Sequence, residues 1–562
     1  MAFVVKKNIS GKDYYYLNEN KRVGDKVKTK TLAYLGKSKE EAEKKAKEII
    51  NNLQKEVSSE NKTEKKQIEI KSELKTKNIS IEELAKFCKE KGFVFRSSDI
   101  YGGFSGFWDF GPLGVELFNN IKQNWWNYFV HQKENMVGID ASIISHPKTW
   151  VASGHVENFN DVFVKCKSCG KSNKLDESEL GKVKCTSCGG EYESQGKFNL
   201  MFETNIGAIN SEKSYLRGET AQGMFMDFKL TQQTSRQQLP FGIAQIGKCF
   251  RNEIAPRDFL FRCREFHIAE FEFFIHPEEK NCDLLNKNHL KVNFNFLDAE
   301  TQKKGDSILK NATIDDLIKR KKLGLWHAYW LAEQIMWLNS IGLNEIKIRE
   351  HMKEELSHYS SATFDVDYEY PFGSQELGGN ANRGQFDLTQ HQEYSKSNLE
   401  IFDEQSAKKI LPRVIEPTFG VERIFLALLT KAYCYDEKRN NIVLKLPPKF
   451  APIKAAIFPI IKKPEFENFA RKIFEDLRKD WNVIYDKSGS IGRRYSRNDE
   501  IGTPFCITID ENSLKNKDVT IRNRDTTEQI RIKINDLKEI LRKGIEGEDI
   551  FSKLKLISTR KK

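Results

Sequence analysis

No apolar run in this chain of 562 residues approaches the ~20 residues that a membrane-spanning helix needs. The first residues, MAFVVKKNIS, contain too short an apolar core for a secretory signal peptide. We therefore expect a cytoplasmic protein with no membrane partner.

The common Gly-rich nucleotide loops are also missing. Residues 242–249, GIAQIGKC, nearly match a P-loop, but Cys249 stands where a serine or threonine hydroxyl would bind magnesium, and a strand-like segment follows. No G-x-G-x-x-G turn lies between a strand and a helix. Any nucleotide site in this chain must therefore be of another kind.

The composition is that of a charge-rich globular protein. Hydrophobic residues make up 39% and charged residues 31%, and 92 basic against 80 acidic residues give a net charge of +12. This length predicts about three to four domains. The mild basic excess permits nucleic-acid binding without requiring it.

Residues 250–274 combine arginines, carboxylates and a phenylalanine in a strand-like alternation. A period of two places one set of side chains on a single sheet face: Arg251, Glu253, Arg262, Arg264, Phe266, Ile268, Glu270 and Glu272. Arginine can hold a phosphate through two N–H bonds, a flat ring can stack on adenine, and a carboxylate can accept its amino group. The alternative is a salt-bridged amphipathic hairpin on a solvated sheet.

Residues 414–429 form a second segment of chemical interest. A strand carrying Glu416 breaks at Pro417, passes Gly420 and enters a helix with Arg423 on its first turns. Glycine allows a close backbone approach, and an arginine at a helix amino terminus strengthens the positive field for a phosphate. The alternative is a plain strand–turn–helix connector with a solvated arginine.

Together these segments resemble motifs 2 and 3 of the class II aminoacyl-tRNA synthetases. The matching elements are Phe-Arg-x-Glu at 250–253, Arg-x-x-x-Phe at 262–266 and Gly-x-x-Arg at 420–423. The long helix after Pro112 and the strand that runs into Pro147 resemble motif 1, the dimer-interface element of that family. Two further segments narrow the resemblance to the homodimeric glycyl-tRNA synthetases: LRGETAQGMF at 216–225 and QELGGNANRGQFDL at 375–388.

This resemblance covers roughly residues 80–545, since residues 492–510 and 520–525 are similar to the anticodon-binding domain of that group. It implies an α+β fold whose antiparallel-sheet catalytic domain spans 78–445, with a zinc-ribbon insert at 160–195 and a helical insert at 280–340. A C-terminal α/β anticodon-binding domain would span 446–562, and its Arg493, Arg494, Arg522 and Arg524 are candidate RNA contacts. Residues 1–77 lie outside the resemblance and form a lysine-rich extension. Strand and turn signals predict a small β-meander at 1–36, helical spacing predicts a helix after it, and residues 55–77 lack an apolar period and are predicted to be a flexible linker.

The resemblance implies a homodimeric ligase that activates glycine with ATP and Mg²⁺ and transfers it to the 3′-terminal ribose of tRNA(Gly). Arg251 would hold the α-phosphate, Glu253 would read the adenine amino group and Phe266 would stack on the ring. Arg262 and Arg423 would hold the γ-phosphate, with Glu376 and the Leu377 carbonyl at the metal–ATP edge. The same ATP site includes Asn252 and Cys263, and the catalytic roles fall on Arg251, Glu253 and Arg423.

The same resemblance places an acidic cage around the glycine ammonium at Glu219, Glu270 and Glu416, and assigns the glycine carboxylate to Arg383. Pro417 belongs to this pocket. Thr418 stands where many relatives have serine, so the hydroxyl is retained. Glycine offers no side chain, so binding must come from its two charged ends, and alanine is refused for lack of room.

Four cysteines form two C-x-x-C pairs, Cys166 with Cys169 and Cys185 with Cys188, fifteen residues apart. This spacing predicts a structural Zn²⁺ with four thiolate ligands, and free thiols are the alternative. The remaining six cysteines are predicted to be reduced and mostly buried.

Two further alternatives concern function. A catalytically inactive homologue that binds nucleic acid should have lost its phosphate and ammonium ligands, whereas these residues are all present. The lysines and tyrosines of residues 1–36 suit either an auxiliary RNA-binding surface or a solvated meander on a charged tether.

Overall fold

The computed structural model describes residues 2–9, 12–23, 26–36, 38–47, 79–175, 180–209, 211–278, 280–404 and 406–552. The chain divides into two compact units, residues 1–77 and 78–562, and each is described by itself. The predicted linker at 55–77 lies outside the described residues. Within the described ranges, no helix combines the length and apolarity that crossing a membrane requires.

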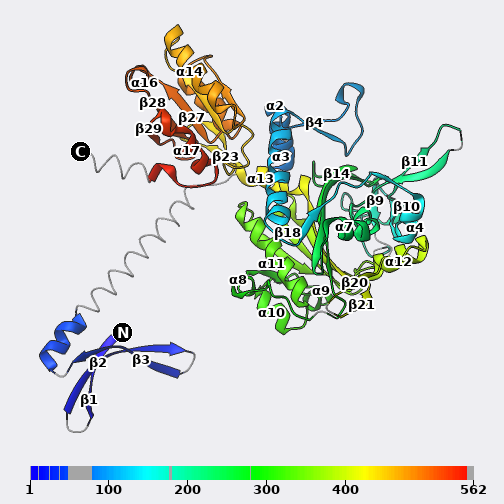
Figure 1. The fold of residues 1–562 in the computed structure, drawn as a ribbon, viewed down its shortest axis with the longest axis horizontal. Helices are drawn as coiled ribbons and strands as arrows, with labels where there is room; N and C mark the ends of the chain where they lie inside the picture. Colours follow the sequence, from blue (N-terminus) through cyan, green and yellow to red (C-terminus); the bar gives the residue numbers. More distant parts are fainter. Residues whose placement is uncertain are drawn as a thin grey trace. The chain divides into compact units, whose positions relative to one another are not determined.

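The described residues of the first unit form a three-stranded antiparallel meander and a helix (Figure 1). Its strands are β1 (Ala2–Ile9), β2 (Lys12–Val23) and β3 (Lys26–Gly36), and the helix covers residues 39–47. A small core of Tyr15, Leu17 and Leu35 packs against Ala42 and Ala46 of the helix. The sequence signals for strands and turns thus predicted this unit correctly.

The second unit is built on a nine-stranded sheet in the order β16-β15-β17-β18-β19-β22-β14-β13-β6. Neighbouring strands are antiparallel except for the pairs β15–β17 and β13–β6. The strands are β16 (Lys310–Thr313), β15 (Asn293–Leu297), β17 (Ile346–Glu350), β18 (Ala362–Tyr370), β19 (Gly373–Gly384), β22 (Arg413–Gly420), β14 (Glu265–Ile275), β13 (Phe241–Phe250) and β6 (Met136–Gly138). The antiparallel α+β class predicted from the sequence is confirmed.

Three long helices pack on one face of this sheet: α3 (Pro112–Trp126), α11 (Leu325–Ser340) and α13 (Val421–Ala432) (Figure 1). Phe271 and Phe273 of β14 point to this side and pack against Trp330 of α11. Phe274 points to the other side and packs against Phe228 at the start of α7. The alternation along β14 therefore leaves Glu270 and Glu272 on the face opposite the three long helices.

Helix boundaries follow local signals. In α2 (Ile81–Lys91), Ser80 and Glu83 form a capping box, and Gly92 ends the helix with φ +78°. α3 begins with Pro112 in its first turn, as predicted, and continues as a π-helical turn over Asn127–His131. The remaining helices of this part are α4 (Pro147–Ala152), α5 (His155–Asn158), α6 (Ala221–Met226), α7 (Phe228–Ser235), α8 (Lys287–Leu290), α9 (Ala299–Lys303), α10 (Ile314–Lys319) and α12 (Phe386–Ser395).

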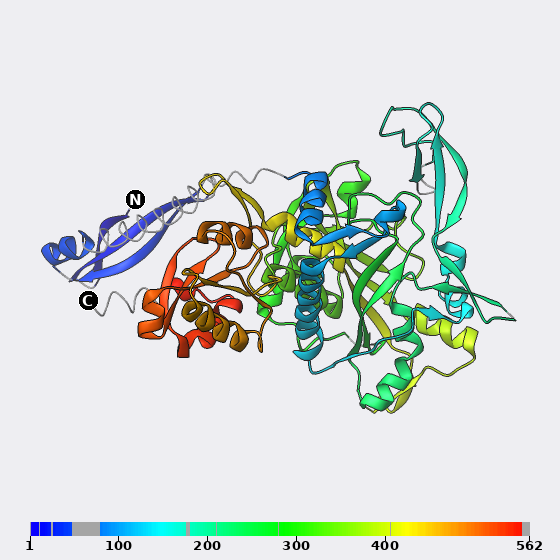
Figure 2. The ribbon, with the colours of Figure 1, turned by 90° about the horizontal axis from the view of Figure 1, so that it is seen from above.

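The short strands form separate small sheets. β8 (Asn160–Cys166), β9 (Ser172–Leu175) and β10 (Tyr192–Asn199) make the cysteine-bearing arm, drawn in cyan to teal in Figure 2. The others are β4 (Val94–Arg96) with β5 (Trp108–Phe110), β7 (Ile144–Ser145) with β11 (Phe202–Ile206) and β12 (Glu212–Leu216), β20 (Ile401–Asp403) with β21 (Lys408–Ile410), and β23 (Tyr433–Asp436) with β24 (Asn441–Leu444).

Residues 280–340, expected to be a helical insert, contain strands as well as helices. β15 and β16 extend the main sheet at its edge, and α11 packs against β19 and β22. The apolar periodicity of α11 dominates this part of the sequence, whereas the two strands have only five and four residues. Short edge strands leave a weak pattern, which is why they were missed.

The C-terminal part has its own sheet, in the order β26-β25-β27-β28-β29, and its own core (Figure 2, orange to red). β25 (Ala455–Pro459) runs parallel to β26 (Val483–Tyr485) and β27 (Phe505–Ile509), whereas β28 (Asp518–Asn523) and β29 (Gln529–Lys533) continue antiparallel. The helices are α14 (Pro464–Leu477), α15 (Ile491–Glu500), α16 (Glu511–Asn516) and α17 (Ile534–Ile545). The sheet is therefore mixed, and helices accompany it as expected of the predicted α/β class.

Candidate active site

A cavity of about 310 Å³ lies on the sheet face opposite the three long helices. Its walls come from β14, β19, β22, the start of α13 and the connection between β13 and β14. Every residue predicted for the ATP site lines it, apart from Asn252: Arg251, Glu253, Arg262, Cys263, Phe266, Glu376, Leu377 and Arg423. The fold thus gathers side chains that lie as far as 172 positions apart, from Arg251 to Arg423.

The connection between β13 and β14 departs from the sequence expectation. Strand alternation was predicted from Arg251 onward, but residues 251–264 form an irregular loop closed by backbone bonds from Arg251 N to Arg264 O and from Arg262 N to Arg257 O. Pro256 lacks an N–H for a strand ladder, and Asp258 and Phe259 have φ of +57° and +56°. The predicted alternation holds only within β14, where Phe266, Ile268, Glu270 and Glu272 share a face.

Arg251 is held by rings and by a backbone oxygen. Its guanidinium carbon lies 5.2 Å from the centre of the Phe159 ring and 5.4 Å from that of Phe266. Its Nε donates to the carbonyl oxygen of Gly218 at 3.1 Å. These contacts fix the stem of the guanidinium beside the flat ring of Phe266, so a phosphate and an aromatic base can be bound side by side.

Arg423 is oriented in a similar way at another wall of the cavity. Its guanidinium carbon lies 4.5 Å from the centre of the Phe261 ring. Its Nη1 donates to the Glu376 carbonyl oxygen at 2.8 Å and lies 3.1 Å from Glu376 Oε2. Gly420 makes room for this arrangement, because a Cβ there would come within 2.9 Å of Arg423 Cδ.

The predicted glycine-site acids lie together in the interior next to this cavity. Register pairs Glu270 with Thr418 across β14 and β22, and Ala381 with Glu416 across β19 and β22. Glu270 accepts bonds from the N–H and hydroxyl of Thr220, and from the Thr418 hydroxyl at 3.3 Å. Thr418 also lines the cavity, so it connects the acid cluster to the ATP side. Pro417 is buried on β22 opposite Asn380.

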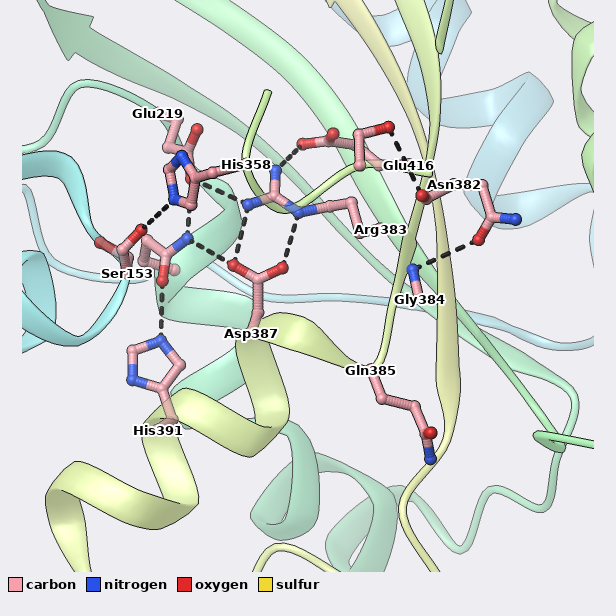
Figure 3. A network of polar contacts seen from close by, with 12 residues as sticks. Ser153, Glu219, His358, Asn382, Arg383, Gly384, Gln385, Asp387, His391 and Glu416 are labelled. Carbon is pink, nitrogen blue, oxygen red and sulfur yellow. Dashed lines mark hydrogen bonds and ion pairs between the residues drawn. The ribbon is translucent and has the colours of Figure 1, made fainter. Parts of the chain in front are cut away.

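Arg383 lies at the centre of this acid cluster and is 2% exposed (Figure 3). Its Nη1 donates to Glu416 Oε1 at 2.7 Å, and its Nη2 lies 3.5 Å from Glu219 Oε1. Its Nε and Nη2 donate to the two carboxylate oxygens of Asp387 at 2.8 and 2.9 Å. The guanidinium also stacks on Tyr359, with its carbon 3.8 Å from the ring centre.

Further polar residues surround this cluster that were not predicted from the sequence. His155 Nε2 lies 3.3 Å from Glu219 Oε2, and Gln222 donates to Glu219 at 2.8 Å and to Asp387 at 3.2 Å. Gln222 and Asp387 stand inside the two segments that narrowed the family resemblance, so their position was a usable signal. Tyr359 and His155 stand in segments without any recognised motif.

The surroundings of these carboxyl groups shift their pKa values in opposite directions. Burial raises the pKa of Glu416 to about 8, with Glu270 and Glu219 adding to the effect and Arg383 opposing it. Burial and the nearby Glu219 raise the pKa of Glu270. Burial acts the same way on Glu219, but His155 and Arg383 outweigh it and hold the pKa of Glu219 well below its usual range. The cluster therefore places Glu219, whose ionised form is favoured, beside Glu416, which is mostly neutral at pH 7.

Glu272 lies behind this cluster and is fully buried. Among the described residues, neither of its carboxyl oxygens has a hydrogen-bond partner. Burial, and then the nearby Glu416, raise its pKa well above the ordinary value. Its surroundings therefore favour the neutral form of Glu272 over the charged one.

The four predicted metal ligands converge in the arm of β8, β9 and β10. The Sγ atoms of Cys166, Cys169, Cys185 and Cys188 all lie within 4.8 Å of one another. Cys166 and Cys188 are 3.5 Å apart, and Cys169 and Cys185 are 3.7 Å apart. Tetrahedral zinc with Zn–S bonds of ~2.3 Å would separate its sulfurs by about 3.8 Å, so the donor set and spacing fit zinc.

Glycines shape both turns of this cysteine cluster. Gly170 N donates to Cys166 O at 2.9 Å, and Gly189 N donates to Cys185 O at 2.7 Å. Both glycines have positive φ, +70° and +73°, which L side chains rarely adopt. The two C-x-x-C-G segments thus fold into matching turns that present their sulfurs to one point.

The C-terminal part corrects one expectation. Arg494, Arg522 and Arg524 had been candidate RNA contacts, but they are only 2%, 5% and 1% exposed. Arg522 forms a two-bonded ion pair with Asp499 at 2.8 and 2.9 Å, and Arg524 donates to the carbonyl oxygens of Gly502 and Leu446. These side chains are buried because they satisfy interior oxygens. Of the four candidates, only Arg493 is exposed.

Comparison with known proteins agrees with this geometry. The family model described as "Anticodon binding domain" matches residues 454–544. The chain is 41% identical to a glycine–tRNA ligase of Borrelia hermsii (strain HS1 / DAH) over 479 residues, covering 83% of this chain and 98% of the relative. It is 43% identical to the glycine–tRNA ligase of Geobacillus thermodenitrificans (strain NG80-2) over 500 residues, with the same coverage of both chains. At this identity over nearly the whole length of its relatives, the chain belongs to the glycine–tRNA ligase family.

Proposed function

We propose that this protein activates glycine with ATP to form glycyl-adenylate and then transfers glycine to the 3′-terminal ribose of tRNA(Gly). The observation that carries this function is the contact, through Thr418, between a cavity lined by arginines and aromatic rings and a buried acid cluster. A nucleotide and a small ammonium compound can be held next to each other there, and these are the two partners of the first reaction.

Positioning and electrostatics carry the first step. The glycine carboxylate attacks the α-phosphorus of ATP, the bond to pyrophosphate breaks, and the negative charge moves onto the leaving oxygens. Arg251, held beside Phe266, stabilises the α-phosphate, and Arg262 and Arg423 stabilise the pyrophosphate. Phe266 stacks on the adenine and Glu253 accepts its amino group, assisted by Asn252 and Cys263. No side chain becomes a nucleophile, so the rate comes from the geometry of bound reactants.

Magnesium supplies charge neutralisation at the ATP phosphates when it is bound. Glu376 at the cavity wall offers carboxylate oxygens, the hard ligands that Mg²⁺ prefers, and its side chain is 46% exposed. Arg423 bonds the Glu376 backbone oxygen as well as its carboxylate, so both charges stay at one edge of the site. Leu377 continues the same backbone beside Gly378.

Glycine is recognised through its charged ends and its size. Glu219, Glu270 and Glu416 surround the ammonium, while Arg383 supplies positive charge for the carboxylate and Thr418 faces the α-carbon beside Pro417. Packing limits the room for a larger amino acid: a Cβ on Gly378 would come within 2.3 Å of the Thr418 carbonyl oxygen, so these strands already lie at close contact. Alanine is refused in this proposal for lack of room for its methyl group.

Structural zinc in the cysteine arm is part of the proposal. Four thiolates fill a tetrahedral shell, which leaves no open position for catalysis. A cytoplasmic location is also part of the proposal, supported by ten cysteines that form no disulfide with one another, eight of them buried.

We further propose a homodimer formed around α3 and the loop that precedes it. Ile100, Tyr101 and Phe104 are 87%, 87% and 77% exposed, and Val115 on α3 is 41% exposed. Large apolar side chains gathered in this way suit burial against a second copy. Analytical ultracentrifugation of the wild type and of Ile100→Asp tests this: the wild type should sediment as a dimer and the variant at lower mass.

Amino-acid-dependent ATP–pyrophosphate exchange is the test of the whole proposal. Wild-type protein should exchange with glycine and show at most weak exchange with alanine or serine. Arg251→Ala should reduce the rate at least about a hundredfold. Arg257→Ala is the matched control, because Arg257 is an exposed arginine of the same loop and lies outside the cavity lining. An inactive nucleic-acid-binding homologue would show no exchange with any amino acid.

A further inference from the structure

Among the described residues of the N-terminal unit, a helix covers one face of the sheet and no element covers the other. Tyr15, Leu17 and Leu35 form its buried side, under the helix over residues 39–47. Side chains alternate along a strand, so the neighbouring positions point away from this helix. The opposite surface is termed the tyrosine face here and comprises Val5, Lys7, Tyr14, Tyr16 and Tyr34.

The strand register brings these side chains together. Val5 on β1 and Tyr34 on β3 both stand opposite Tyr16 on β2, and Lys7 stands opposite Tyr14. The Tyr34 ring centre lies 5.3 Å from that of Tyr16 and 6.3 Å from that of Tyr14. Lys7 Nζ lies 5.4 Å from the centre of the Tyr16 ring. Three rings and an ammonium thus form one continuous patch.

This patch is accessible and lies in a basic part of the chain. Tyr34 is 52% exposed, and Lys7 is exposed beside Tyr16. Residues 2–36 contain eight lysine and arginine residues and three aspartate and glutamate residues, a net charge of +5. An apolar protein partner would gain little from so many cations, whereas a polyanion with flat bases complements both the charge and the rings.

We propose that the tyrosine face binds the tRNA substrate by stacking unpaired bases on Tyr16 and Tyr34 while Lys7 contacts a backbone phosphate. This rests on the proposed function, which makes tRNA a substrate of the chain. Proteins bind RNA mainly at unpaired loops and ends, where splayed bases can stack on aromatic side chains, including those on the open face of a sheet. The face therefore adds tRNA affinity from outside the site where the chemistry takes place.

Substitutions in the full-length protein test this inference against in vitro transcribed tRNA(Gly). Loss of one stacking ring costs ~1–3 kcal/mol per base, so Tyr34→Ala should weaken the Kd for tRNA at least about fivefold. Tyr34→Phe is the matched control and should stay within about twofold, because it keeps the ring. Lys7→Gln should lower the slope of log K against log salt by about 0.7–0.9, the contribution of one phosphate contact.

Glycine-dependent pyrophosphate exchange separates this inference from the proposed function, because exchange needs no tRNA. All three variants should exchange at the wild-type rate, which also shows that the second unit is folded. Far-ultraviolet circular dichroism and thermal unfolding check that the first unit is folded in each variant. Lys7→Gln changes an exposed side chain outside the core, so it tests the face without disturbing the packing of this unit. Normal exchange with wild-type tRNA affinity in both Tyr34→Ala and Lys7→Gln would overturn the inference, whereas absent exchange in the wild type would overturn the function.

Discussion

Arg383 and Asp387 form a fully buried ion pair in which two parallel N–H bonds join the guanidinium to both carboxylate oxygens, at 2.8 and 2.9 Å. Asp387 is 1% exposed and starts α12, whereas Arg383 ends β19. The pair therefore ties the sheet to the helix and fixes the plane of the guanidinium. With that plane fixed, Nη1 points at Glu416, so Asp387 determines where positive charge lies in the acid cluster.

Replacing Asp387 should damage both stability and glycine binding. Asp387→Ala leaves a buried arginine short of a partner, and breaking a buried pair in this way costs about 3–5 kcal/mol. We expect a lower urea midpoint and a higher KM for glycine, with the KM for ATP nearly unchanged. Asp387→Asn, which keeps one acceptor and the shape, should fall between the wild type and alanine. An Asp387→Ala protein with the wild-type midpoint would contradict this role.

The raised pKa of Glu416, about 8, predicts a pH dependence of glycine binding. Below that pKa the carboxyl is mostly neutral, and an incoming ammonium favours its ionised form, so binding releases a proton. The KM for glycine in pyrophosphate exchange should fall about tenfold per unit as pH rises from 6 to 7 and level off above pH 8. Glu416→Gln should raise the KM and remove most of this dependence. The KM for ATP over the same pH range is the control, because it reports titration of groups other than Glu416.

The same carboxyl predicts the sign of a stability change. Because the pKa of Glu416 is raised in the folded protein, its contribution is fully present below the unfolded pKa of about 4.5 and is lost as pH rises through about 8. Glu416→Gln should therefore reduce the decline in thermal midpoint between pH 5 and 8. A decline equal to that of the wild type would show that other groups cause it.

The cysteine arm should depend on metal. Cys185→Ser removes one thiolate of the four, so purified protein should hold well below one zinc per chain, whereas the wild type should hold about one by atomic emission. The buried Cys506→Ser in the C-terminal part is the control for loss of a thiol as such. Pyrophosphate exchange should persist in Cys185→Ser, because none of the four cysteines lines the cavity. Equal zinc contents in the two variants would exclude the predicted ligand set.

The sequence predicted the elements better than their connections. Helix caps such as Ser80 with Glu83 and the alternation within β14 depend on neighbouring residues, so they can be read locally. The backbone of the loop at 251–264 could not be predicted from neighbouring residues, because its polar side chains follow the spacing of a strand while its backbone turns at Pro256. The family resemblance nevertheless singled out residues of this loop that line the cavity, since it depends on identity and order and not on the local backbone.

Within the candidate site, the predicted residues lie close together, but several residues that contact them could not be predicted from the sequence. Glu219, Glu270, Arg383 and Glu416 lie far apart in sequence, and only the register of β14, β22 and β19 brings them together. His155 and Tyr359 contact the cluster from short segments without periodicity. The exposure of an arginine likewise depends on long-range packing, which is why Arg522 resembled a surface contact in the sequence.

The buried Arg522 and the exposed Arg493 of the C-terminal part should respond differently to substitution. Arg522→Ala leaves Asp499, which is 1% exposed, without its two-bonded partner, although Arg439 still contacts it at 3.1 Å. We expect unfolding of this part at lower temperature, and weaker tRNA binding as a consequence. Arg493→Ala removes an exposed cation and should raise the KM for tRNA in aminoacylation with no change in thermal midpoint. Differential scanning calorimetry and aminoacylation kinetics on both variants make the comparison. Pyrophosphate exchange needs no tRNA, so both variants should keep this activity below the unfolding temperature. An Arg522→Ala protein with the wild-type thermal midpoint and reduced tRNA affinity would instead show that Arg522 contacts tRNA directly.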